Sequence, residues 1–79
     1  MLSVPPFLCI EILSPEDRMS RVWERLHDYF AMGVSNVWII DPETCSAHIA
    51  GPSGDLHRVT DALRTGDPAF EVPLTEIFE

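Results

Sequence analysis

The fold is decided by residues 7–40, which read FLCIEILSPEDRMSRVWERLHDYFAMGVSNVWII. The first seven of them, residues 7–13, are almost continuously apolar and follow two prolines, a pattern typical of a central strand buried on both faces. Residues 36–40 form a second short apolar run, which the Asp41-Pro42 turn signal ends. Because a helical segment separates the two runs, this stretch predicts one βαβ unit with a right-handed parallel crossover.

The segment between the two strands carries helix signals at both ends. Ser14 is the expected N-cap, and Asp17 follows three residues later, where an acid offsets the first free backbone N–H groups. Gly33 stands where a left-handed C-terminal cap is needed. The pattern predicts a helix of about eighteen residues whose apolar stripe faces the sheet. We expect Trp23 and Trp38 to be core anchors. The apolar side chains recur at intervals of three and four: Met19, Val22, Trp23, Leu26, Tyr29 and Phe30.

The second half of the chain predicts a smaller antiparallel extension. Residues 46–50 are expected to return beside the second strand, and a GPSG turn at 51–54 leads into another strand at 56–59. Residues 70–79 are expected to be extended chain with one helical turn near 74–78. The predicted fold class is therefore α/β, with a small mixed sheet built around one βαβ unit in a single domain.

Charge and composition narrow the function classes. The 79 residues include thirteen acidic and five basic side chains, all five of them arginine, and the net charge is −8 at pH 7. This balance argues against an autonomous nucleic-acid binder and against binding to an anionic membrane surface. No stretch approaches the roughly 18 apolar residues of a membrane span, and no secretory signal is evident. With Cys9 and Cys45 expected to be free thiols, we expect a soluble cytoplasmic protein.

Glu11 is the first candidate for chemistry. A carboxylate inside an apolar strand costs several kcal/mol to desolvate unless a cation, a metal or hydrogen-bond donors compensate it. The strand places Glu11 on one face with Cys9 and Leu13, near the carboxyl end where clefts in α/β sheets form. Two interpretations stay open: a structural pair with an arginine or with solvent at a sheet edge, and a ligand site.

The predicted helix carries three arginines, Arg18, Arg21 and Arg25, within about 60° of one another. They form either a solvated border over the core or a basic ridge from which one arginine turns towards Glu11 and a phosphate-like ligand. Asp41 either converges on the same crevice or belongs to the Asp-Pro turn.

Residues 5–44, PPFLCIEILSPEDRMSRVWERLHDYFAMGVSNVWIIDPET, resemble the second half of the Uma-type putative restriction endonuclease domains, a bacterial group within the PD-(D/E)XK nuclease superfamily. The matching motifs are EILSP around the glutamate, the Asp28-Tyr29 pair and VWIIDP, and the likeness continues loosely into FEVPLTEIF. The resemblance implies a restriction endonuclease-like fold and hydrolysis of DNA phosphodiester bonds with Mg²⁺ or Mn²⁺, whose chemistry is activation of water and stabilisation of charge.

By this resemblance Glu11 is the metal-binding acid of the strand, and Arg25 stands where many members carry a lysine. The superfamily's own lysine position is Leu13, and Phe7 stands where many members have an aspartate. Arginine keeps the positive charge but stays protonated, so it cannot transfer a proton. The resemblance places the first metal-binding aspartate before Met1. We therefore interpret residues 1–79 as one partial domain, truncated at the N-terminus.

These expectations lead to two classes of function. In the first, the chain is a fragment of a metal-dependent DNA nuclease that does not cleave DNA alone, because one carboxylate is a poor site for Mg²⁺. In the second, it is a non-catalytic interaction or oligomerisation module whose exposed sheet edge pairs with a partner or a second copy. The acidic second half could also bind a basic partner protein.

Overall fold

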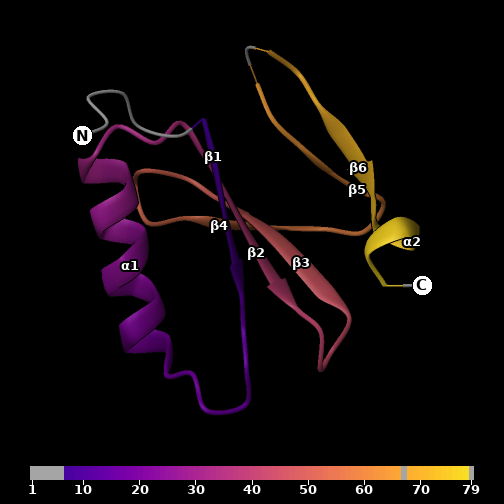
Figure 1. Cartoon of the computed structure of the whole chain (residues 1–79), viewed down its shortest axis with the longest axis horizontal. Helices are drawn as coiled ribbons and strands as arrows, with labels where there is room; N and C mark the ends of the chain where they lie inside the picture. Colours follow the sequence, from indigo (N-terminus) through magenta and orange to yellow (C-terminus); the bar gives the residue numbers. More distant parts are fainter. Residues whose placement is uncertain (1–6, 67, 79) are drawn as a thin grey trace.

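The computed structural model describes residues 7–66 and 68–78. It contains a mixture of strands and helices, as the sequence predicts (Figure 1). Along the chain the elements are β1 (Leu8–Ile12), α1 (Met19–Ala31), β2 (Asn36–Asp41), β3 (Ser46–Ala50), β4 (Leu56–Val59), β5 (Ala62–Arg64), β6 (Glu71–Pro73) and α2 (Leu74–Ile77).

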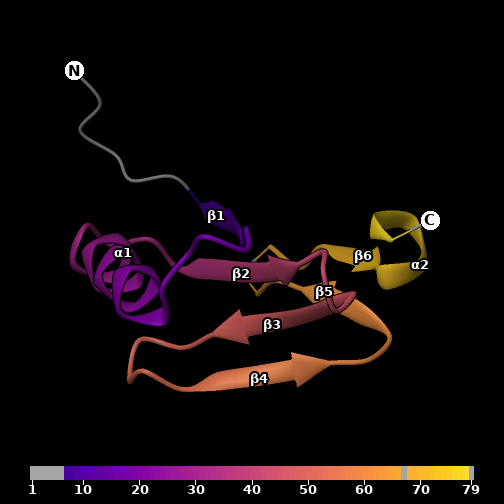
Figure 2. The ribbon, with the colours of Figure 1, turned by 90° about the horizontal axis from the view of Figure 1, so that it is seen from below.

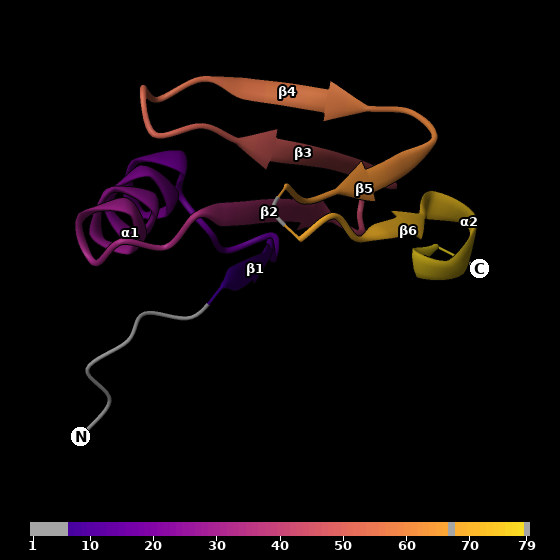
Figure 3. The same ribbon diagram turned by 90° about the horizontal axis from the view of Figure 1, so that it is seen from above.

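Four strands form one mixed sheet in the order β1-β2-β3-β4 (Figures 2 and 3). β1 and β2 pair in parallel and are connected by α1, whereas β3 and β4 are added antiparallel. The expected βαβ unit and antiparallel extension are therefore confirmed. A second sheet pairs β5 with β6, and α2 follows as the expected helical turn. The strand β5 is not predicted by the sequence pattern, because three residues are too few to show a period.

The two faces of the four-stranded sheet pack against different layers, so the molecule has two apolar clusters. Figure 1 shows α1 on one side of the sheet and β5, β6 and α2 on the other. Beneath α1, one cluster buries Val22, Leu26, Val34, Val37, Ile39 and Ala50. On the opposite face, the other cluster buries Trp38, Ile40, Ala47 and Leu63.

Strand β1 differs from its expected central position. Within the described residues it is an edge strand; its α1 face is covered, and on the opposite face Leu8 packs against the second cluster. On its other face Ile10 is 49% exposed and Ile12 is 64% exposed, whereas their neighbours on β2, Trp38 and Ile40, are buried. The prediction of a strand buried on both faces is therefore wrong for β1, and β2 is the strand with residues in both apolar clusters. An apolar run indicates that a strand packs against other apolar residues, but it does not indicate whether the strand lies at the edge or in the centre of the sheet.

Helix α1 begins later than the sequence predicts, at Met19, with Arg18 in the N-cap position and no side-chain cap. Ser14 is not the N-cap. Its backbone N–H donates to Asp17 Oδ2 over 2.8 Å, and the Asp17 N–H donates back to the Ser14 carbonyl over 3.0 Å. These reciprocal bonds close a separate turn before the helix, which shortens α1 to 13 residues.

The C-terminal end of α1 confirms the expected glycine cap. Gly33 has φ of 92°, in the left-handed region. Its N–H donates to the Phe30 carbonyl over 3.1 Å, and the Val34 N–H donates to the Tyr29 carbonyl over 3.0 Å. This pair of bonds is the Schellman arrangement, which satisfies the last carbonyls of a helix and turns the chain towards β2.

Only one of the two tryptophans is a core anchor. Trp38 of β2 is buried, and its indole N–H donates to the Arg64 carbonyl over 3.1 Å, which ties the sheet to β5. Trp23 is 37% exposed at the border of α1, so its predicted core position is wrong. Both tryptophans fit an apolar period, but Trp23 lies at the edge of the stripe.

We expect Gly33→Ala to destabilise the fold by about 1 kcal/mol, because a side chain at this positive φ strains the helix end. Urea unfolding of the variant and of wild type measures the difference. Gly66→Ala is the matched control, since open space surrounds the added methyl group there. Equal losses in the two variants would contradict the special role of Gly33.

Candidate functional site

The candidate site is built around Glu11 on β1. The parallel register places Glu11 beside Ile39 of the central strand, with its side chain on the face that α1 covers. Glu11 is 9% exposed, which makes it a buried acid in an otherwise apolar layer. Such a group requires compensating donors.

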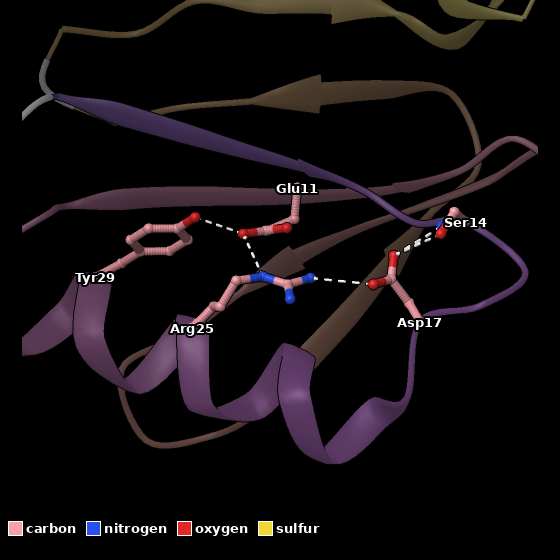
Figure 4. A network of polar contacts seen from close by, with 5 residues as sticks. All are labelled: Glu11, Ser14, Asp17, Arg25 and Tyr29. Atoms are coloured by element: carbon pink, nitrogen blue, oxygen red, sulfur yellow. Dashed lines mark hydrogen bonds and ion pairs between the residues drawn. The ribbon is translucent and has the colours of Figure 1, made fainter.

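Two side chains of α1 supply those donors (Figure 4). Arg25 Nε donates to Glu11 Oε1 over 3.0 Å, and the Tyr29 hydroxyl donates to the same oxygen. Arg25 and Tyr29 are four residues apart, so one turn of helix presents both to the carboxylate. The expected turn of one ridge arginine towards Glu11 is thus observed. Tyr29 was expected to belong to the apolar stripe, and only its spacing from Arg25 could have indicated its second role.

The two oxygens of Glu11 have different surroundings. Within the described chain, every hydrogen bond to the Glu11 side chain ends on Oε1. Within the described chain no hydrogen bond reaches Oε2. The donors from α1 therefore hold the carboxylate by Oε1.

Protonation follows from the same contacts. The hydrogen bond to Glu11 raises the pKa of Tyr29 to about 12, and burial and the negative charge of Glu11 act in the same direction. The bond to Glu11 also raises the pKa of Arg25. Burial, together with the charge of Glu11, raises the pKa of the Cys9 thiol on the same strand. At neutral pH the site therefore contains a phenol, a guanidinium and a thiol around Glu11.

Asp17 extends the network to the start of the helix. Its Oδ1 lies 3.7 Å from Arg25 Nη2, and its Oδ2 accepts from Ser14. The Ser14 backbone N–H is the main cause that lowers the pKa of Asp17. Arg25 therefore bridges the carboxylates of Glu11 and Asp17 (Figure 4).

The arginine ridge borders a polar hollow of about 370 Å³ at the start of α1. Arg18 and Arg21 are exposed, and within the described chain neither side chain forms an ion pair or a hydrogen bond. Arg25 lines the same hollow and is bound to Glu11, so the hollow and the buried acid are adjacent. The hollow is lined by Glu16, Asp17, Arg18, Arg21 and Arg25.

A divalent cation does not fit the described residues on their own. Among residues 7–66 and 68–78, no group of three or more His, Cys, Asp or Glu side chains lies close enough to hold a metal ion. Asp41 accepts the Glu43 backbone N–H over 3.1 Å in the turn after β2, as its turn alternative predicts. Glu11 thus offers one carboxylate oxygen to a metal ion, because its other oxygen accepts from Arg25 and Tyr29.

We expect Glu11→Gln to lower the pKa of Tyr29 from about 12 towards its usual value of about 10, because the charged acceptor is lost. Tyr29 is the only tyrosine, so the ultraviolet absorbance of phenolate reports it alone. Since the pKa in the folded state is the higher one, the stabilisation is complete below pH 10 and is lost as the pH rises through about 12.

Glu24→Gln is the control for this titration, since Glu24 is exposed on the same helix. A midpoint that Glu11→Gln and Glu24→Gln shift equally would contradict the bond between Tyr29 and Glu11.

Comparison with known proteins shows the fold and the family of this chain. A solved structure with the same fold is the crystal structure of a putative nuclease belonging to DUF820 from Anabaena variabilis, with a TM-score of 0.73 and 21% sequence identity. The similarity covers 95% of this chain and 45% of that chain, so this chain spans less than half of its neighbour. No match is found among curated proteins. No helix of the described residues is long and apolar enough to cross a membrane.

The fold and the family expected from the EILSP and VWIIDP motifs agree with these findings. The matching family model extends over residues 1–76, nearly the whole chain. The chain belongs to the Uma2 family, whose description is putative restriction endonuclease.

Proposed function

We propose that this chain contributes the acidic strand of a metal-dependent DNA phosphodiester hydrolase and that the chain alone does not cleave DNA. The observation that carries the proposal is the state of Glu11: Arg25 and Tyr29 hold one oxygen, and within the described chain no hydrogen bond reaches the other. A fixed carboxylate with one free oxygen is suited to bind a hard cation such as Mg²⁺ or Mn²⁺.

In this proposal Arg25 provides charge and position. Its guanidinium remains protonated, so it stabilises negative charge near Glu11 and does not accept a proton. Tyr29 fixes the rotamer of Glu11, because its hydroxyl and Arg25 Nε approach the same oxygen from two directions.

The proposal requires ligands that the described residues do not supply. Mg²⁺ is usually held by one or two carboxylates together with substrate oxygens, and among the described residues no group of three or more His, Cys, Asp or Glu side chains comes together around Glu11. We propose that the chain acts as a partial domain, in keeping with its 45% coverage of the similar nuclease. The two free thiols, Cys9 and Cys45, are compatible with a cytoplasmic location.

We expect the purified chain to leave supercoiled plasmid intact in Mg²⁺ or Mn²⁺, because one carboxylate does not complete the metal site. Mn²⁺ should still broaden the NMR signals of residues around Glu11 in the wild type, at high metal concentration. Glu11→Gln should abolish this broadening. Glu24→Gln, the same substitution at an exposed position of α1, should preserve it.

Broadening that survives Glu11→Gln would contradict the proposed ligand. Plasmid nicking that disappears in Glu11→Gln would show instead that the chain alone, or two copies of it, completes an active site.

A second candidate function is favoured by the edge of the sheet. Within the described residues β1 has one paired edge, towards β2, and on its outer face Ile10 is 49% and Ile12 64% exposed. An unpaired edge with apolar side chains is prone to add a strand from another chain. The alternative is therefore a non-catalytic interaction module that pairs through β1 with a second copy or a partner.

We expect wild type to form dimers or larger species at roughly tens of micromolar, if β1 is the contact. Ile12→Lys should shift the protein to monomers, because a charge at the edge opposes strand addition. Met32→Lys is the control, since Met32 is similarly exposed, at 58%, but lies at the end of α1. Light scattering that shows a monomer in all three proteins would exclude this function.

A further inference from the structure

The chain gathers most of its positive charge at one place. Three of its five basic side chains, Arg18, Arg21 and Arg25, line the polar hollow at the start of α1, although the whole chain carries a net charge of −8. These three arginines form a cluster, whereas the basic side chains of an acidic protein are ordinarily dispersed over its surface.

The contacts of these side chains divide the cluster into two parts. Arg25 is committed to Glu11 and Asp17, and Asp17 in turn is held by Ser14. Arg18 and Arg21 are exposed and make no ion pair or side-chain hydrogen bond within the described chain. The hollow therefore contains two guanidinium groups whose donors are available to an anion.

One acidic group opposes them. Glu16 lines the hollow, and it is the carboxylate there that neither Arg25 nor Ser14 engages. Because Arg25 is shared by two carboxylates, the three arginines face three acids and the site has no net positive charge, so attraction for an anion rests on the free donors of Arg18 and Arg21.

Guanidinium groups match the geometry of phosphate oxygens and bind them through charge-assisted hydrogen bonds. Because Arg25 belongs both to the hollow and to the Glu11 network, a phosphate in the hollow lies next to the buried acid. We propose that Arg18 and Arg21 bind the DNA backbone through phosphates that neighbour the phosphodiester group facing Glu11. This inference rests on the proposed function and names its nucleic-acid contact.

The net negative charge of the chain determines how tightly we expect it to bind DNA. An acidic protein repels DNA at long range, so affinity comes from local contacts and falls steeply with salt. Each phosphate contact contributes about 0.9 to the slope of the logarithm of affinity against the logarithm of salt concentration.

The test is an NMR titration of the whole chain with a short DNA duplex at low salt, with EDTA present. The side-chain Nε–H signals of the arginines report each residue separately. We expect saturable shifts for Arg18 and Arg21, and none for Arg58, an exposed arginine on β4 that is outside the hollow. No shift of Arg18 and Arg21, or equal shifts for Arg58, would overturn the proposal.

Matched variants give an independent measurement. Arg21→Gln should reduce the salt slope by about 1, whereas Arg58→Gln removes the same charge and should leave it unchanged. Glu16→Gln should tighten binding, because it removes the opposing acid. Equal effects of Arg21→Gln and Arg58→Gln would show instead that binding depends on the overall charge of the protein and not on the hollow. Since metal is absent, these results do not depend on hydrolysis, and a failure of the metal-site proposal at Glu11 is observed separately by Mn²⁺ broadening.

Discussion

The burial of the Glu11 carboxylate is the constraint on which the arrangement of β1 and α1 depends. A charge in this apolar layer is tolerated because Arg25 and Tyr29 donate to it from the helix above. Both donors require α1 to lie at one rotation and one height over β1. The polar contact therefore specifies the register between helix and sheet, whereas the surrounding apolar side chains supply non-directional burial.

The same contact joins structure to the proposed chemistry. The two sequence interpretations of Glu11, a structural pair and a ligand site, are compatible because the carboxylate has two oxygens. Arg25 and Tyr29 donate to Oε1, and within the described chain no hydrogen bond reaches Oε2. Arg25 also reaches Asp17, so the buried acid is connected to the arginine hollow at the surface. The stability of the fold and the proposed ligand binding therefore depend on the same network of side chains.

The sheet shows why the chain has an exposed edge. β2 is covered by α1 on one face and by β5 and α2 on the other, and Trp38 ties it to the second layer through the Arg64 carbonyl. That second layer is small and packs chiefly on β2 and β3, so the outer face of β1 remains open at Ile10 and Ile12. An edge of this kind is compatible with either further strands or association between chains.

The sequence by itself determined the features that arise from local chemistry. These are the βαβ order, the glycine cap at Gly33, the later strands β3 and β4, the need for a partner at Glu11 and the family. Such signals depend on period, caps and turn residues that lie close together in the chain. Tertiary structure decided that β1 lies at an edge and that Tyr29 shares Glu11 with Arg25, because both depend on contacts between residues far apart in the chain. The start of α1 at Met19 is a local outcome that the pattern did not decide, because the turn closed by Ser14 and Asp17 and a cap at Ser14 differ little in free energy.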